Sequence, residues 1–578
     1  MNKNLIKQLV KSFQKMNLDG LLITNNDKHL NENTNLQLKI IYHLLKFDSS
    51  FCYLIILKTK IGLFTDGRYL LQAKSQFKKQ NVIIKEFNCE NLTNFINSNF
   101  KNGCVIGTDP EHISIYDFKN IKKYLFLCAS TLIPVSIHQL NKNKFKIPNF
   151  NNSQMLSLPK SHIPRSIISN IEYIKSKIKS DALLVWDNAQ VAYILNIRSF
   201  EINNSTKPFA GLLICKKGKN ILISNNNKFN SIKKINKYFH IFSYENFFKK
   251  LPLLKLSKIE VDFEKINLLF FQKLRHLNID LIKTKTNLSK FISKKTNIEI
   301  KNINKAQFQD GLAVNKFFIY LYLNKKKLNK ETEFSLAKKL ETFRKQRVNF
   351  FKNSFDYISA FGANASIIHY KPTKQNSLPF NINSIYLIDS GAHYLEGTTD
   401  VTRVLSFKKT PLKIKNIYTF LVKSLIKIEQ SFFNFPLNSK TLDKKIRSYL
   451  AKNNIFYPHG TGHGVGYFND VHERPPVISK SSVDVISTNN FFSLEPGFYI
   501  DNNFGLRLEN LYFSKKTNGK IKLINTTLIP YEMNLINKSL LTIKEKKHII
   551  NYHSYIYNNF KDFLSEEESN YFNNYYYF

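Results

Sequence analysis

Two aspartates lie eleven positions apart, in settings that would bring their carboxylates together. Asp389 follows the apolar run YLI, Asp400 precedes the run VTRV, and Gly391 and Gly397 lie between them. This pattern predicts two buried strands joined as a hairpin. Two like charges held close together in a low dielectric are unstable unless something neutralises them. A pair of divalent metal ions would do so, and the rest of the chain must then supply the other ligands.

Three motifs downstream offer such ligands. HGTGHGVG places His459 and His463 four positions apart, but its glycines favour a loop or strand edge over a helix. Glu495 ends an apolar strand directly before a Pro–Gly turn, and Glu509 alternates with Arg507 on one strand face. Two Asp, one His and two Glu are the donors that a binuclear site for Mn, Co or Zn needs.

Each of these residues also has an ordinary structural explanation. A lone aspartate at a strand end is more often a turn or cap residue, and a lone histidine is usually on the surface or in the core. The glutamate before Pro–Gly is often only an exposed turn residue. The joint order and settings favour the metal site over these alternatives. For His393, between the two aspartates, we expect a solvent-facing side chain. For His369 we expect a position directly after a short apolar strand, Ile367-Ile368, where a core histidine is the alternative to a functional one.

Two predicted helices precede the segments that carry these residues, and each has a clear start signal. Thr296 and Glu299 form a capping-box pattern, and Thr332 is a predicted N-cap for a second helix. Before them, short apolar strands such as Gly20–Thr24 alternate with helical stretches, which indicates an α/β domain. Residues 160–295 repeat that plan, and we place a linker at 141–164, where periodicity is lost.

Composition bounds the remaining alternatives. The 578 residues suit two to four domains, and the net charge of +44 is mostly lysine spread along the chain. We interpret this charge as a solvated surface, with a polyanion-binding surface as the alternative. The five cysteines suit reduced thiols, and neither a signal peptide nor an apolar run of membrane-spanning length is present, so we expect a cytoplasmic protein without a membrane partner. The acidic, then Asn/Tyr-rich tail from Glu566 is predicted to be a loose end.

The order Asp389, Asp400, His463, Glu495, Glu509 resembles the ligand set of the pita-bread metallopeptidases. Other motifs are similar to the aminopeptidase P (Xaa-Pro aminopeptidase) family in its three-domain form. They are TDGRYLLQA in the first domain, WDNAQVAYILNIRSFEI in the second, SFDYISAFGANASIIHY at the catalytic-domain entry, and LIPYEMNLINKSLLTIKEKKHIINYH near the C-terminus. The resemblance covers nearly the whole chain.

The resemblance implies an α/β plus α+β architecture. Two creatinase-like α/β domains, 1–150 and 151–295, would precede a pita-bread catalytic domain at 296–525 and a C-terminal extension at 526–578. The implied function is release of the first residue from peptides with proline in second position, through a hydroxide activated by two divalent metals. Manganese is the first expectation for these ions, with cobalt or zinc as alternatives. A homodimer and peptide substrates are implied as partners, and we expect no nucleic-acid partner.

The resemblance also implies a role for each site residue. Asp400 and Glu509 would bridge the two metals, Asp389 would complete the shell of one, and His463 with Glu495 the shell of the other. Glu495 would also accept a proton.

The remaining residues would assist the reaction. His472 would stabilise the developing oxyanion, and His369 would orient or shuttle protons on the substrate side. His459 matches the third active-site histidine. Arg507 would hold Asp389 or a neighbouring carboxylate in place.

Some segments depart from the pattern of the aminopeptidase P family. The segment LKFDSSFCY at 45–53, the loop at 203–211 and Phe361 differ from the family, which bears on cleft shape and dimer contacts.

Prolidase or another pita-bread peptidase is one alternative function. A pita-bread domain without catalytic activity, used as a binding module, is an alternative of a different class.

Overall fold

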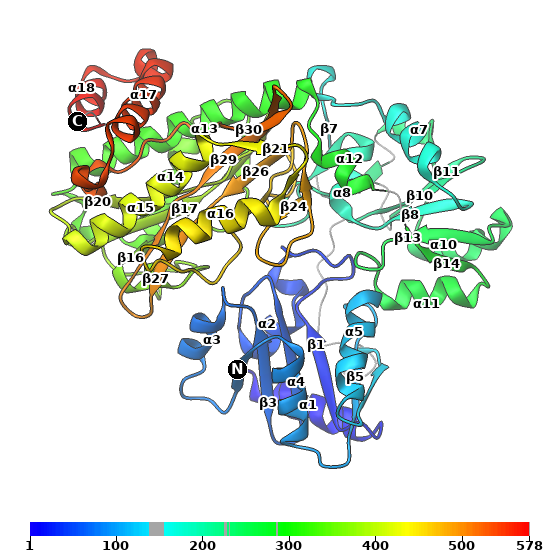
Figure 1. Ribbon diagram of the computed structural model, residues 1–578. Coiled ribbons are helices and arrows are strands. Elements are labelled where there is room, and N and C mark those ends of the chain that lie inside the picture. The colour runs from blue at the N-terminus through cyan, green and yellow to red at the C-terminus, as the bar shows by residue number, and fades with distance from the viewer. Residues whose placement is uncertain (138–154, 225–227, 230–231, 285–286, 577–578) are drawn as a thin grey trace. The chain divides into compact units, whose positions relative to one another are not determined.

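The computed structural model describes the chain except for residues 138–154, 225–227, 230–231, 285–286 and 577–578 (Figure 1). It divides into two compact units. Unit 1 comprises residues 1–158 and 165–288, and unit 2 comprises 159–164 and 289–578. The predicted division into four domains stays a prediction. Most of the predicted linker, residues 141–154, lies outside the described residues, while β7 (Met155–Ser157) pairs with β9 (Ile197–Ser199) in unit 1.

Unit 1 contains two six-stranded sheets of the same topology. In each sheet the pairings run parallel, antiparallel, antiparallel, parallel and parallel from one edge strand to the other. The repeated plan expected from the sequence is therefore present strand for strand. The first sheet has the order β4-β3-β2-β1-β5-β6, with the bounds Ile83–Glu86, Ile61–Thr65, Cys52–Leu57, Gly20–Thr24, Val105–Thr108 and Thr131–Pro134. The second has the order β12-β11-β10-β8-β13-β14, with the bounds Phe239–Phe242, Asn220–Ile223, Gly211–Cys215, Ala182–Val185, Lys258–Val261 and Asp280–Lys283.

Helices surround these two sheets. Those of the first are α1 (Lys3–Gln14), α2 (Ile40–Leu45), α3 (Leu70–Gln76), α4 (Cys89–Asn97) and α5 (Ile115–Phe126). The longer ones of the second are α7 (Ile167–Lys177), α8 (Asn188–Leu195), α10 (Tyr244–Lys250) and α11 (Leu268–His276). Leu5, Leu9 and Phe13 of α1 are buried, at the spacing of one helix face.

Unit 2 begins with two capped helices. Thr296 and Glu299 form the predicted capping box of α13 (Asn297–Asn324). Thr332 caps α14 (Glu333–Lys345) as predicted, in a box completed by Ser335. Two further helices, α15 (Leu412–Glu429) and α16 (Ser439–Ala451), pack against β30 and β24, and the C-terminal helices are α17 (Ile543–Phe560) and α18 (Glu566–Tyr576) (Figure 1).

The strands of unit 2 form several sheets. One has the order β16-β17-β20 (Ile358–Phe361, Ile385–Ser390, Val401–Ser406), and a second has the order β15-β18-β19 (Phe350–Asn353, Ala392–Tyr394, Gly397–Thr398). A six-stranded sheet has the order β21-β30-β29-β26-β23-β24 (Phe432–Asn434, Lys520–Asn525, Asn510–Thr517, Phe491–Leu494, Gly462–Gly464, Glu473–Ile478). A hairpin pairs β27 (Gly497–Ile500) with β28 (Phe504–Arg507).

Three local expectations are wrong. His393 is fully buried in β18 and bonds the Thr398 hydroxyl (3.1 Å), because its strand is paired on both sides. The tail from Glu566 is not loose: it forms α18, whose Phe572 and Tyr576 are buried at helical spacing. His369 does not follow a strand, since the preceding segment is the 3₁₀ helix η6 (Gly362–Ser366) and a turn.

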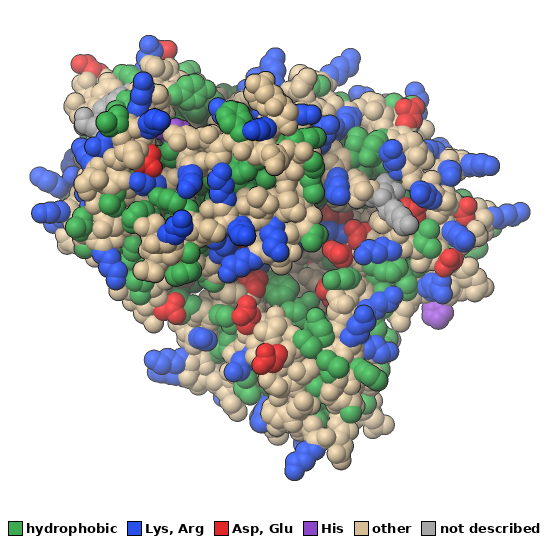
Figure 2. Space-filling model, in the orientation of Figure 1, with side chains coloured by type: hydrophobic (Ala, Val, Ile, Leu, Met, Phe, Trp, Pro, Cys, Tyr) green, Lys and Arg blue, Asp and Glu red, His purple; other side chains and the backbone are tan. Residues whose placement is uncertain are grey.

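The surface charge is distributed rather than concentrated. Figure 2 shows lysine and arginine side chains scattered over the viewed face of both units, with acidic side chains among them. This distribution supports the interpretation of the charge as a solvated surface.

Candidate metal centre

The two aspartates approach each other because β17 and β20 pair in antiparallel register. Asp389 in β17 lies opposite Thr402, and Asp400 immediately precedes β20. Their connection is longer than a simple turn, since it contains β18 and β19. Gly391 is required where this connection returns: a Cβ there would lie 2.1 Å from the Thr399 carbonyl oxygen. The predicted pair of strands is confirmed, with a small additional sheet built into its connection.

The other acidic and histidine residues come from neighbouring strands of unit 2. His463 lies in the middle of β23, which pairs with β24 and β26, so the HGTGHGVG segment is not a helix, as predicted, and its strand is interior rather than at an edge. Glu495 follows β26, and Glu509 lies between β28 and β29, where its backbone N–H donates to the Thr402 carbonyl (3.2 Å).

Ligand atoms of Asp400, His463 and Glu509 all lie within 4.8 Å of one another. The His463 Nε2 atom is 3.6 Å from Asp400 Oδ2 and 3.6 Å from Glu495 Oε1. These four predicted ligands therefore lie together.

The electrostatics of this cluster suit cations. Burial and the neighbouring Glu509 carboxylate raise the pKa of Asp400 well above its usual value. Burial and the Glu495 carboxylate do the same to the pKa of Glu509. Within the described part of the chain, the buried Asp389 Oδ1 atom has no hydrogen-bond partner. Buried carboxylates with free oxygens and one imidazole fit divalent metal ions, whose charge would offset the repulsion among them.

Arg507 holds the fifth predicted ligand, as expected. Its Nη2 atom donates to Asp389 Oδ2 at 2.7 Å, and both side chains are nearly buried. The same guanidinium donates from Nη1 to the Tyr499 hydroxyl (2.8 Å) and from Nε to the Thr402 hydroxyl (3.3 Å). Thr402 in turn donates to Glu509 Oε2 (3.1 Å).

Tyr499 and Thr402 are not among the site residues predicted from the sequence. Thr402 has the same strand parity as Asp400, so the period of two along β20 could have indicated it. For Tyr499 we find no comparable signal.

The three predicted helper histidines lie in different settings. The His472 ring packs edge-on against the His463 ring, with centroids 4.4 Å apart. The Nε2 atom of His459 lies 2.8 Å from the Tyr499 hydroxyl, which connects this histidine to Arg507. His369 follows η6, which packs against β28, the strand of Arg507.

Comparisons with known proteins match this architecture along the chain. Residues 301–516 match metallopeptidase family M24, and 521–576 match the C-terminal region of peptidase M24. Residues 6–139 and 146–299 each match a creatinase/prolidase N-terminal domain. The chain therefore contains a metallopeptidase family M24 domain preceded by two creatinase/prolidase N-terminal domains, and the expected fold class is confirmed.

Among relatives, the chain is similar to Xaa-Pro aminopeptidases. It is 29% identical to "Xaa-Pro aminopeptidase 1" of Dictyostelium discoideum over 585 residues, covering 95% of this chain and 91% of the relative. It is 28% identical to "Probable Xaa-Pro aminopeptidase P" of Arthroderma gypseum over 544 residues, covering 89% and 85%.

Solved structures show the same fold. The X-prolyl aminopeptidase of Caenorhabditis elegans, described as a cytosolic enzyme with a di-nuclear active site, superposes with a TM-score of 0.89 at 23% identity, over 98% of both chains. The Xaa-Pro dipeptidase of Bacillus anthracis reaches 0.53 at 20% identity, over 64% of this chain and 99% of its own. No described helix here is long and apolar enough to cross a membrane.

Proposed function

We propose that this metallopeptidase is a metal-dependent aminopeptidase that releases the first residue of peptides whose second residue is proline. The named relatives support the substrate class. The observation that carries the proposal is the group of buried Asp400, half-buried His463 and buried Glu509, with Glu495 beside His463 and Asp389 paired to Arg507.

The five acidic and histidine residues would hold two divalent ions. Asp400 and Glu509 would be shared between the ions, Asp389 would bind one of them, and His463 with Glu495 the other. Manganese is our first proposal, with cobalt or zinc as alternatives, because four carboxylates and one imidazole suit these ions. When bound, such ions polarise a carbonyl and lower the pKa of water, which supplies a nucleophile at neutral pH.

The side chains of the protein would then do the remaining work. Arg507 orients Asp389, and Thr402 orients Glu509, through the hydrogen bonds they make. Glu495 would accept a proton, and His472 would donate to the oxygen that becomes negative during attack on the first carbonyl. His459 and His369 would bind and orient the substrate, with His459 fixed by Tyr499. Proline at the second position presents a tertiary amide without an N–H.

The test combines metal analysis with hydrolysis of a tripeptide X-Pro-Y. We expect about two ions per wild-type chain, and we expect Asp400→Ala to lose at least one ion and the activity. Asp562→Ala, an exposed aspartate in unit 2, is the matched control and should keep both. Full activity after chelation would refute the metal requirement.

A dipeptide X-Pro distinguishes the proposal from the prolidase alternative. Hydrolysis of the dipeptide alone would overturn the aminopeptidase assignment. The structural comparison favours the aminopeptidase, since the dipeptidase covers 64% of this chain and the aminopeptidase 98%. No activity with any added metal would favour a binding module, although all five ligand residues are present.

We also propose a cytoplasmic homodimer with peptide substrates as its partners and no nucleic-acid partner. The cytosolic description of the C. elegans relative supports the location. Light scattering of the purified chain tests the dimer.

A further inference from the structure

Arg403 is a buried arginine whose hydrogen-bond partners are all neutral. Only 1% of the side chain is exposed. Its guanidinium donates to four backbone carbonyls, the Asn510 side-chain oxygen and the Tyr552 hydroxyl. Burying a charge is costly unless its donors are satisfied, and the planar fork of arginine satisfies them only in a fixed geometry. Arg403 therefore fixes the positions of its acceptors relative to one another.

These acceptors belong to two places that are distant in the sequence. The Nη1 atom donates to the carbonyls of Glu509 (2.6 Å) and Thr402 (3.0 Å), beside the carboxylate cluster. The Nη2 atom donates to the Ile529 carbonyl (2.6 Å), and Nε donates to that of Pro530 (3.1 Å). One side chain thus joins the backbone of a proposed bridging ligand to the C-terminal region, which we define as residues 526–576.

Asn510 doubles this connection. Its side-chain oxygen accepts from Arg403 Nη2 (2.8 Å), and its Nδ2 donates to the Tyr531 hydroxyl (3.1 Å). Asn510 follows Glu509 directly and is fully buried. The residue after the proposed ligand is therefore also held by the C-terminal region.

The two C-terminal helices hold Ile529 and Tyr531 in turn. From α17, the Tyr552 hydroxyl lies within hydrogen-bond distance of the carbonyls of Thr527 (2.8 Å) and Ile529 (2.9 Å). The backbone N–H of Tyr531 donates to His553 Nε2 (3.0 Å), whose Nδ1 lies 2.7 Å from the Tyr576 carbonyl in α18. Because Nε2 accepts a hydrogen bond, the Nδ1 atom carries the ring proton and donates to the Tyr576 carbonyl.

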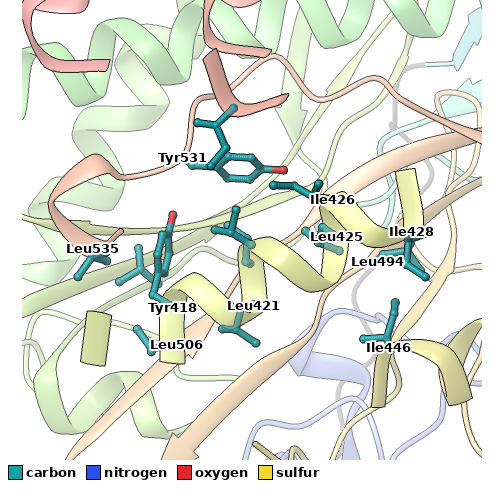
Figure 3. Close-up of a cluster of buried hydrophobic side chains, with 14 of the residues drawn as sticks. Tyr418, Leu421, Leu425, Ile426, Ile428, Ile446, Leu494, Leu506, Tyr531 and Leu535 are labelled. Carbon is teal, nitrogen blue, oxygen red and sulfur yellow. The ribbon is translucent and has the colours of Figure 1, made fainter. Parts of the chain in front are cut away.

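Apolar packing joins the same parts. Figure 3 shows Tyr531 and Leu535 beside residues of α15, in a cluster that also contains Leu494 and Leu506. Leu494 precedes Glu495, and Leu506 precedes Arg507. The C-terminal region therefore contributes to the core on which the strands of the metal centre rest.

We propose that the C-terminal region is an internal brace that acts through Arg403 to hold Glu509 opposite Asp400, and that Arg403 is a positioning residue for ion binding. The inference rests on the proposed metal function. The alternative is that the C-terminal region only covers the core. Substitutions in it would then lower the stability of the fold, and ion affinity would fall no more than in any other variant of equal stability. The two possibilities can be separated by comparing ion affinity with thermal stability.

The experiment measures the affinity of the metal-free full-length chain for Mn²⁺, in competition with a chelator, together with the midpoint of thermal unfolding. Arg403→Lys keeps the charge and removes the fork. Tyr552→Phe is the milder variant, which decides the question if Arg403→Lys does not fold. Tyr557→Phe in the same helix is the matched control for Tyr552→Phe. It removes a hydroxyl that accepts a hydrogen bond from Asn573 Nδ2 (3.0 Å) and takes no part in the hydrogen bonds of Arg403 and its acceptors. Ile549→Val, also in this helix, is the control for stability. It removes a buried methyl group and so lowers the stability of the fold, but it removes no hydrogen bond.

We expect Arg403→Lys to weaken binding of the weaker ion about tenfold or more, which is the usual effect of removing a group that positions a metal ligand. Tyr552→Phe should weaken it about threefold, whereas Tyr557→Phe and Ile549→Val should leave it within about twofold of wild type. Wild-type affinity in a folded Arg403→Lys or in Tyr552→Phe would overturn the brace. Equal weakening in Ile549→Val would also overturn it, because affinity would then follow stability alone. A wild-type chain that binds no divalent ion would overturn the proposed function and the brace with it.

Discussion

Thr402 shows how an uncharged side chain can organise the metal centre. It is fully buried, donates to Glu509 and accepts from Arg507, which itself pairs with Asp389. One hydroxyl therefore connects two proposed ligands that come from different strands. A ligand oxygen that is hydrogen-bonded in this way keeps its orientation when it meets an ion.

Replacing this hydroxyl should weaken ion binding. We expect Thr402→Val to lower the affinity for Mn²⁺ about tenfold, because Glu509 loses the donor that orients it. Thr402→Ser keeps a hydroxyl and should recover most of the loss. Titration of the metal-free chain measures both, and equal affinity in the valine and serine variants would contradict this role.

Glu532 is a second residue whose setting has a measurable consequence. It is buried and accepts hydrogen bonds from the hydroxyls of Tyr322 and Tyr575, which joins α13 and α18. Burial raises the pKa of Glu532 to about 7, from 4.5. The Glu532 carboxyl group therefore holds its proton more tightly in the folded state than in the unfolded chain. The stability that Glu532 contributes is complete below about pH 4.5 and is lost as the pH rises through about 7.

The pH dependence of unfolding tests this setting. The rise in pKa corresponds to roughly 3 kcal/mol of stability that wild type loses between about pH 5 and 8. Glu532→Gln cannot ionise, so its melting midpoint should fall less over that range. Glu567→Gln, an exposed glutamate of α18, should follow wild type. A Glu532→Gln curve parallel to wild type would show that Glu532 does not titrate in this way.

At the scale of elements, the approach of β23 to β26 brings His463 near Glu495. A Cβ at Gly462 would lie 1.9 Å from the Ser493 carbonyl oxygen, so no other residue fits between these strands without moving them apart. Two residues away, a Cβ at Gly460 would meet its nearest atom at 3.5 Å, an ordinary contact. The two glycines of one motif therefore have different structural roles.

Alanine at each position should separate these roles. Gly462→Ala should destabilise unit 2 by about 3 kcal/mol and reduce ion affinity, because it moves His463 away from Glu495. Gly460→Ala should be tolerated. Thermal unfolding and ion titration of both variants provide the measurement, and a Gly462→Ala variant as stable as Gly460→Ala would contradict the close approach.

The sequence predicts the elements of this site better than the contacts among them. Asp389 and Asp400 are found by the apolar runs beside them, because alternation and strand ends are local properties. The contact of Tyr499 with His459, and those of Arg403 with Glu509 and Ile529, join segments that are distant along the chain, which a single sequence does not record. His393 was mistaken for a surface residue because a polar side chain near glycines resembles a loop, whereas here the connection is itself a small sheet. The C-terminal helix was missed because its acidic and Asn-rich composition masked the apolar spacing of Phe572 and Tyr576.

At the scale of the molecule, the four clustered residues proposed as ligands and Asp389 all lie in unit 2. A ligand that binds only the folded form stabilises the part of the protein that holds it. Bound ions should therefore raise the stability of unit 2 directly.

Calorimetry with and without a chelator should show this difference. We expect the chelator to lower the transition of unit 2 by several degrees and to leave that of unit 1 unchanged. Asp400→Ala identifies the transition of unit 2, because its midpoint should be insensitive to the chelator or nearly so. A chelator effect on both transitions to the same extent would show that the two units unfold together.

The position of the Arg403 acceptors also bears on the order of events during synthesis. Domains generally fold as units, the N-terminal ones first while the ribosome is still at work. Unit 1 lies entirely before residue 289, so it can fold early. The proposed ion ligands come later, and Ile529, Tyr552 and Tyr576, which belong to the proposed brace of Glu509, come last. If the brace acts as proposed, a nascent chain has a folded N-terminal half before its ion site is complete. Release of the polypeptide before about residue 576 should then yield a partly folded protein that binds its ions weakly.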